Sequence, residues 1–154
     1  CSNTSKVKAT IANQLALYLT MYSPLQMAAD FPEHYEQFSD AFQFIKDVAV
    51  DWQKSKYLLA EPGDYIVVAR KAKKTGKWFA GGVTDENSRT LDVPMNFLDP
   101  GKTYVAKIYS DASDADYQKN PQAYVINEQE VTSESVLPIF MARGGGFAIE
   151  FSEK

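Results

Sequence analysis

The chain opens with apolar positions at helical spacing. Between Lys6 and Tyr22 they recur at the i, i+4 and i+8 intervals of one helix face. The positions are Val7, Ile11, Leu15, Tyr18, Leu19 and Tyr22. Alanines widen this face, so the pattern predicts a helix packed on more than one side. Ser23-Pro24 ends the helix, because proline has no amide hydrogen and disfavours helix in the residue before it.

A short apolar run and a second helical pattern follow. Leu25 to Ala29 is nearly all apolar, which is typical of a strand covered on both faces, and Asp30 comes directly after it. Phe31-Pro32-Glu33 predicts the start of a second helix, since proline suits the first helical position and a negative charge suits the first turn. Its expected apolar positions are Tyr35, Phe38, Phe42 and Ile45.

From about residue 48 the pattern changes to strands separated by turns. Glu61-Pro62-Gly63-Asp64 is strong turn chemistry. Strands are expected at 48–59, 65–69, 78–84, 89–93, 104–109, 124–127, 131–140 and 146–151. The predicted fold class is α+β, with a helix-strand-helix unit at 1–58 and an antiparallel β-sandwich at 59–154. One buried strand between two helices cannot form a sheet by itself, so residues 1–58 resemble the end of a larger unit.

Composition and charge narrow the possible partners. The net charge is −4 and the pI about 5.0, so nucleic acid is not expected as a partner. The basic cluster around Thr75-Gly76, which includes Arg70, is expected to be a solvated hairpin tip. No apolar stretch is long enough for a transmembrane segment. The sole cysteine, Cys1, excludes an internal disulfide and a cysteine zinc site.

Three long strings of the sequence carry a family resemblance. They are "ATIANQLALYLTMYSPLQMAADFPEHYEQFSDAFQFIKDVAVDW", "EPGDYIVVARKAKKTGKWFAGGVTDENSRTLDVPMNFLDPGKTYVAKIYSDASDADYQKNPQAY" and "RGGGFAIEF". In this order they resemble the C-terminal end of glycoside hydrolase family 97, which contains α-glucosidases and α-galactosidases. The resemblance implies that 1–58 is the last helix-strand-helix of a (β/α)₈ barrel and that 59–154 is an accessory C-terminal sandwich.

The resemblance also implies what this chain lacks. The family's catalytic carboxylates and its glutamate ligands for calcium lie upstream, so no catalytic, metal or cofactor residue is assigned here. Glycoside hydrolysis needs two carboxyl groups at a fixed separation, and the chain is not expected to be an active glycosidase alone. Such enzymes are typical of the periplasm or outer membrane of Bacteroidetes. Cys1 is a candidate lipidation site, a remnant of cloning or an internal residue of a longer parent.

Two residues are candidate sugar contacts. Asp30 follows the expected barrel strand, where barrel enzymes place their chemistry, although a helix cap is the favoured interpretation. Trp78 is a candidate member of an aromatic sugar platform, against the favoured interpretation as a core residue. Asp111, Asp114 and Asp116 invite a calcium interpretation but lack EF-hand spacing, so a solvated acidic loop is expected. His34 has no recognisable triad partner, and Gly144 to Gly146 is expected to be a turn.

Two functions remain open. The first is the C-terminal portion of a glycosidase acting on α-glycosides, which closes and braces the barrel. The alternative is a free-standing envelope module that binds carbohydrate or protein through the sandwich. The expected partners are the remainder of the barrel, an oligosaccharide, and further copies of the chain through its exposed apolar surface.

Overall fold

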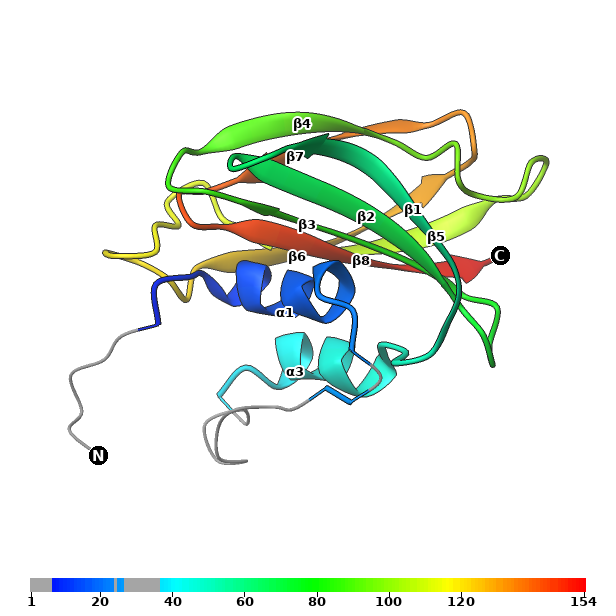
Figure 1. The fold of residues 1–154 in the computed structure, drawn as a ribbon, viewed down its shortest axis with the longest axis horizontal. Helices are drawn as coiled ribbons and strands as arrows, with labels where there is room; N and C mark the ends of the chain where they lie inside the picture. Colours follow the sequence, from blue (N-terminus) through cyan, green and yellow to red (C-terminus); the bar gives the residue numbers. More distant parts are fainter. Residues whose placement is uncertain (1–6, 24, 27–36) are drawn as a thin grey trace.

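The computed structural model describes residues 7–23, 25–26 and 37–154. Figure 1 shows three layers: helices lie against one face of a large sheet, and a small sheet covers the other face. The helices within the described residues are α1 (Ile11–Thr20) and α3 (Ser39–Asp47). An antiparallel β-sandwich with two helices is therefore confirmed.

In the part of the chain that the structure describes, eight strands form the two sheets, and every pairing between them is antiparallel. The large sheet has the order β1-β2-β3-β8-β5-β6, and β4 pairs with β7 in the small sheet. The bounds are β1 (Trp52–Glu61), β2 (Tyr65–Ala72), β3 (Trp78–Thr84), β4 (Arg89–Pro94), β5 (Tyr104–Asp111), β6 (Tyr124–Val131), β7 (Val136–Met141) and β8 (Gly146–Glu153). The predicted hairpin of β2 and β3 is confirmed, whereas the run 131–140 is interrupted by a turn before β7 begins.

The core between the two sheets is made of large apolar side chains on alternate strand positions. Phe147 and Ile149 of β8 face Val93 and Met141 of the small sheet, and all four are fully buried. Strand alternation predicts this arrangement, because residues i and i+2 share one face.

A second core joins the helices to the large sheet. Ala12, Leu15, Ala16 and Leu19 form the buried face of α1, at the i, i+3, i+4 and i+7 spacing. The predicted face was partly wrong, because Val7 and Tyr22 are each 64% exposed, whereas the burial of Ala12 and Ala16 agrees with the prediction that alanines widen the face. Small side chains let the helix approach the sheet closely, and Gly81 has the same effect from β3: a Cβ there would lie 2.8 Å from Leu19 Cδ1.

The buried face of the second helix was predicted in part, because the predicted Phe38 and Ile45 pack against this core. Ala41, Phe44 and Val48 are its buried contacts with the sheet, whereas Phe42 is only partly buried. Phe44 lies 5.3 Å from the ring centroid of Tyr109 and 6.3 Å from that of Phe79. The predicted helix start at residues 31–33 lies outside the described residues.

Part of the predicted helix-strand-helix unit lies outside the described residues. Leu25 and Gln26 are not in a strand, and 27–29 and Asp30 are not among the residues described. β1 runs continuously through residues 58 and 59, where a domain boundary was predicted. The assignment of 1–58 to a barrel and the division after residue 58 stay predictions.

Candidate functional site

The helix-covered face of the large sheet holds the buried charged side chains of the described residues. Arg70, Asp111 and Glu150 are each less than 9% exposed. Arg70 binds α1, and Asp111 binds the turn before β8 that contacts α1. Glu150 accepts a hydrogen bond from Lys77 Nζ at 2.7 Å. Buried charge is costly unless it is hydrogen-bonded, so these contacts mark specific attachment points. The contacts of Arg70 and Asp111, with a third contact between Tyr124 and Asp40 at the protein surface, attach the helices to the large sheet, and we call these three contacts anchors.

The first anchor fixes the C-terminal end of α1. Arg70 of β2 donates from Nε to the carbonyl oxygen of Leu19 at 2.6 Å and from Nη1 to Ser55 Oγ at 2.7 Å. Its guanidinium lies 5.5 Å from the ring centroid of Tyr22 and 6.0 Å from that of Trp52. A cation at a helix C-terminus satisfies a free carbonyl and complements the helix dipole. Arg70 therefore ties α1 to β2.

The position of Arg70 corrects the expected solvated hairpin tip. Lys73 and Lys74 are exposed as predicted, but Arg70 is only 4% exposed. Burial lowers the pKa of Arg70, and the nearby hydroxyls of Tyr57 and Tyr22 oppose this shift. Arg70 could not be distinguished from the neighbouring lysines by the charge run alone. Strand alternation turns its side chain toward the helix, whereas the lysines of the turn extend into solvent.

The second anchor holds the N-terminal end of α1. Thr10 caps the helix by accepting a hydrogen bond from the Asn13 amide at 3.1 Å. Asn13 Nδ2 donates to the carbonyl oxygen of Gly145 at 2.9 Å. Asp111 Oδ2 accepts from the amide of Gly146 and from that of Ala142, each at 2.9 Å. The helix cap and the turn before β8 thus form one hydrogen-bonded unit.

Asp111 is buried, which corrects its expected place in a solvated loop. Burial raises the pKa of Asp111, while the hydroxyl of Thr10 and the amides of Ala142 and Gly146 oppose the shift. Gly145 lets the carboxylate approach, since a Cβ at this position would lie 1.9 Å from Asp111 Oδ2. The predicted turn is confirmed at Gly144, which has φ +61°, whereas Gly146 is already the first residue of β8.

The third anchor holds the first turn of α3. Tyr124 of β6 donates to Asp40 Oδ1 at 2.5 Å, and its ring packs edge-on against Phe38 at 6.2 Å. The hydrogen bond from Tyr124 lowers the pKa of Asp40. Burial, with Asp40 beside it, raises the pKa of Tyr124. The carboxylate also suits the positive end of the helix.

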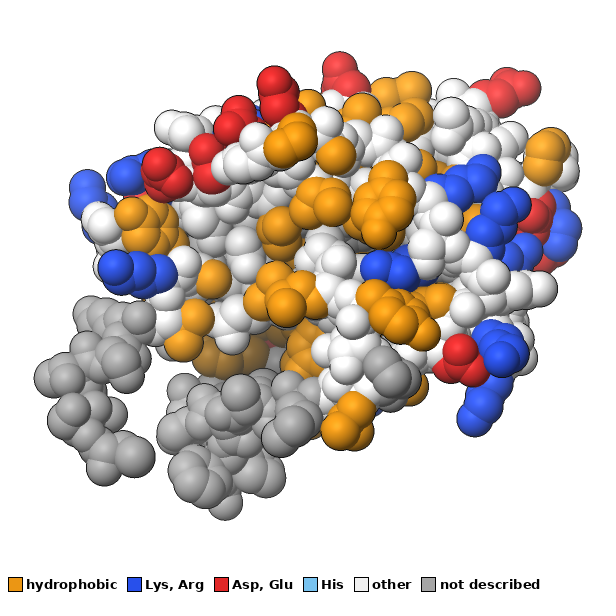
Figure 2. Space-filling model, viewed as in Figure 1, with side chains coloured by type: hydrophobic (Ala, Val, Ile, Leu, Met, Phe, Trp, Pro, Cys, Tyr) orange, Lys and Arg blue, Asp and Glu red, His pale blue; other side chains and the backbone are white. Residues whose placement is uncertain are grey.

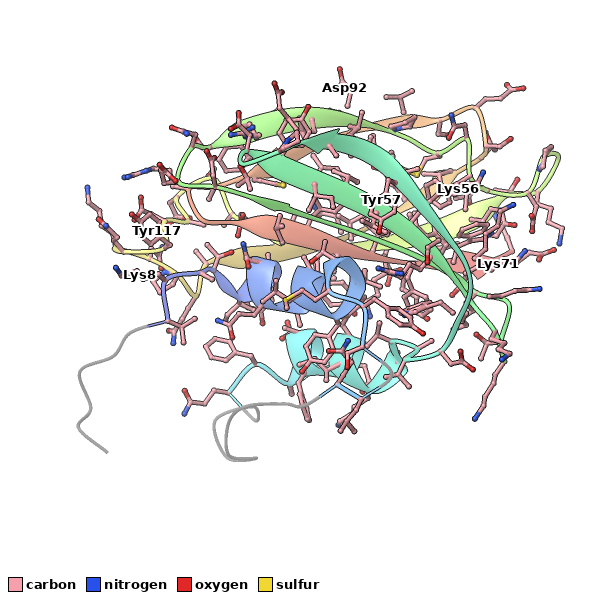
Figure 3. The ribbon with its side chains drawn as sticks, in the orientation of Figure 1. Lys8, Lys56, Tyr57, Lys71, Asp92 and Tyr117 are labelled. Atoms are coloured by element: carbon pink, nitrogen blue, oxygen red, sulfur yellow. The ribbon has the colours of Figure 1, made fainter. Side chains whose placement is uncertain are left out.

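Apolar side chains remain exposed beside the first anchor. Met21, Tyr22, Leu25 and Tyr57 are 62%, 64%, 73% and 70% exposed. We call these four residues the Tyr57 surface. Figure 2 shows hydrophobic side chains gathered across the middle of the side that it views, and Figure 3 labels Tyr57, which lies on the edge strand β1. Clustered exposed apolar residues mark an interaction site more often than isolated ones do.

The predicted sugar contacts do not form a site in the described residues. Trp78 is 2% exposed and packs 5.2 Å from the ring centroid of Phe97, so its ring faces are not accessible to a sugar. It is a core residue, which is the interpretation that the sequence favoured, and its candidate role in sugar binding stays a prediction that this position does not support. Asp30 and His34 lie outside the described residues. No group of three or more histidine, cysteine or acidic residues in 7–23, 25–26 and 37–154 is placed to hold a metal ion.

An open hollow next to Asp85 offers little chemistry. It has a volume of about 310 Å³ and is lined by residues that include Lys8, Glu86 and Tyr117. Asp85 accepts hydrogen bonds from the Asn87 amide at 2.9 Å and from Arg89 Nη2 at 2.7 Å. The Asn87 amide lowers the pKa of Asp85, so this carboxylate is a structural acceptor rather than a base.

No helix among the described segments could cross a membrane.

These features define a class of protein. The sandwich binds two helices through three anchors, and an apolar surface lies beside the first of them. The arrangement is that of an accessory domain attached to further structure.

Comparison with known proteins gives the family. The family model described as "Glycosyl-hydrolase 97 C-terminal, oligomerisation" matches residues 51–152, and the chain belongs to this family. A retaining alpha-galactosidase of Bacteroides thetaiotaomicron is 31% identical over 150 residues, which are 97% of this chain and 22% of that protein. A probable retaining alpha-galactosidase of Streptomyces bingchenggensis is 28% identical over 91% of the chain and 20% of its own length. The chain thus spans about a fifth of these relatives.

Solved structures agree with the family. A glycoside hydrolase family 97 enzyme from Pseudoalteromonas sp. strain K8, in complex with acarbose, is 46% identical with a TM-score of 0.93. The match covers 96% of this chain and 23% of that protein, so it includes both helices as well as the sandwich. A beta-arabinopyranosidase at 18% identity and a TM-score of 0.75 shares the fold. The predicted resemblance to the C-terminal part of a family 97 enzyme is confirmed.

Proposed function

We propose that this chain is the non-catalytic C-terminal part of a glycosidase that acts on α-glycosides, and that it braces the catalytic part. The observation that supports the proposal is the set of three anchors, of which the Arg70 and Asp111 anchors are buried. They attach both ends of α1 and the first turn of α3 to the sandwich. A domain that only followed the catalytic part as an appendage would not need these fixed attachments of its helices.

The brace acts on the connection between the helices. Arg70 holds the end of α1 that precedes this connection, and Tyr124 holds the first turn of the helix that follows it. The family resemblance assigns the last barrel strand to this connection. Fixing both of its ends on a rigid sheet restricts where that strand can lie, and the Tyr57 surface is the face we assign to the rest of the barrel.

The wider properties of the parent enzyme are also proposals. The relatives' names support an α-galactoside or an α-glucoside as the substrate class. Calcium bound upstream, a periplasmic or outer-membrane location, and lipid on Cys1 are retained as expectations. Membership of a C-terminal domain family disfavours the alternative of a free-standing binding module.

Self-association is a second proposed role, because the family description includes oligomerisation. The sequence predicted that it would use apolar surface left by the missing barrel. In the brace proposal that surface meets the catalytic part instead, so a different face is needed for another copy.

Complementation tests the brace. The upstream part of the parent enzyme is produced without residues 1–154 and mixed with this chain, and hydrolysis of nitrophenyl α-galactoside and α-glucoside is measured. We expect no hydrolysis from the chain alone and recovery of activity in the mixture. Leu25→Asp should weaken recovery by about tenfold or more, because it places a charge in an apolar contact.

The matched control is Val125→Asp, an exposed valine on β6. It should leave recovery unchanged. Hydrolysis by the chain alone, or equal recovery with both variants, would contradict the proposal. Folding of each variant is checked by circular dichroism.

A further inference from the structure

The outer face of the small sheet is more apolar than expected for a solvent-facing sheet. Strand alternation turns Val93, Leu137 and their i+2 neighbours into the core. The opposite positions face outward: Thr90, Asp92 and Pro94 on β4, and Val136, Pro138 and Phe140 on β7. Four of these six side chains are apolar, although antiparallel sheets usually present polar residues to water. We call these six residues the β4–β7 face.

The β4–β7 face lies on the side of the molecule opposite to the helices. Figure 1 shows β4 and β7 along one side, with α1 and α3 along the other and the large sheet between them. Figure 3 shows Asp92 pointing away from the body of the molecule. A catalytic part that docks on the helix side therefore leaves this face free.

Prolines in the β4–β7 face oppose the addition of a further strand to the small sheet. Pro138 pairs with Asp92, and Pro94 pairs with Val136. A proline cannot donate a hydrogen bond to an added strand, so prolines on edge strands oppose strand addition. Contact through the side chains of the face is favoured over pairing along its edges. Val136 is 55% exposed and is available for such a contact.

We propose that the β4–β7 face is the contact between two copies of this protein. The proposal rests on the accessory-domain function above and assigns the oligomerisation role of the family to one face. A pair of identical copies meets through the same face on each, about a two-fold axis. Since Asp92 is the one charged residue of the face, the axis passes nearer to Val136 and Pro94, which keeps the two carboxylates apart.

The area of the β4–β7 face determines how strong a dimer we expect. Six-residue strands are about 20 Å long and two of them about 10 Å wide, so the face covers about 200 Å². A stable interface buries about 800 Å² on each partner. The face is therefore the apolar centre of the contact, and the surrounding loops complete it. We expect a reversible dimer whose population depends on concentration.

Analytical ultracentrifugation of the full 154-residue chain over a concentration series tests the proposal. Val136→Glu should weaken dimerisation by about tenfold or more, because it places like charges across a shared face. Asp92→Asn should strengthen it, because it removes the one charge. Val125→Glu on β6 and Leu25→Glu on the Tyr57 surface are matched controls, and both should leave the dimer unchanged.

Two results of the ultracentrifugation would contradict a dimer contact at the β4–β7 face. A wild-type chain that is monomeric at every concentration contradicts the proposal. Loss of the dimer in Leu25→Glu but not in Val136→Glu also contradicts it, because association then uses the surface assigned to the catalytic part. Complementation of activity can succeed in either case, so failure here is separate from failure of the brace.

Discussion

The two faces of the large sheet are built differently. On the small-sheet face, Phe147, Ile149 and their neighbours fill the space with apolar side chains. On the helix face, small residues and glycine bring α1 close, and Arg70 and Asp111 add directional hydrogen bonds. Apolar packing is non-directional and supplies most of the stability, whereas hydrogen bonds with strict geometry fix position. The helix face is thus suited to hold the helices in one register.

The largest expected effect comes from the small-sheet face. Phe147→Ala should lower the free energy of unfolding by about 3–5 kcal/mol, because the residue is fully buried between the sheets and its loss leaves a cavity. Urea denaturation followed by tryptophan fluorescence measures this change. A loss of less than 1 kcal/mol would show that the two sheets do not share a close-packed core.

Asp111→Ala should have the next largest effect. The amides of Ala142 and Gly146 lose their acceptor in a buried site, which costs about 1–3 kcal/mol for each group left unsatisfied. Asp114→Ala on the same loop is exposed and should have little effect. Equal losses in the two variants would contradict the role of Asp111 as an anchor.

Arg70→Met tests the first anchor with the side-chain stem retained. The carbonyl of Leu19 and the hydroxyl of Ser55 lose their donor, so the free energy of unfolding should fall by about 1–3 kcal/mol. Hydrogen exchange should quicken in α1 more than in β3. The control is Lys74→Met in the exposed turn of the same hairpin, which should match the wild type.

Tyr124→Phe should have the smallest effect at neutral pH, about 0.5–1.5 kcal/mol for one hydrogen bond. Its pH dependence is more informative. The pKa of Tyr124 is raised in the folded protein, so the unfolded state loses its proton first, from a pH of about 10 upward. Wild-type stability should fall above that pH, and the fall should be shallower in Tyr124→Phe. Identical alkaline limbs would contradict the assignment.

The sequence predicted the strands better than the attachment of the helices. Alternation of apolar residues places β2, β3 and β8 and their core side chains correctly, because a strand has only two faces. The buried faces of the helices were less predictable. Ala12 and Ala16 contribute through the close approach that they permit, and this depends on Gly81 in a strand that is distant in sequence.

The anchors could not be predicted from local patterns. Arg70 lies in a basic run and Asp111 in an acidic one, and both runs are typical of solvated loops. What distinguishes the two residues is their strand position, which turns each side chain toward α1. The odd and even positions of β2 and β5 were a usable signal, but only once the helices were known to cover that face.

Hydrogen exchange of the wild-type chain tests the central claim that the sandwich holds the helices as one unit. Amides of the second half of α1, residues 15–20, are compared with those of β3 and β8. We expect α1 to exchange in the same slow class as these strands, and Arg70→Met and Asp111→Ala each to move it to a faster class. Rapid exchange of α1 in the wild type, with the strands still protected, would contradict the claim that the sandwich holds the helices.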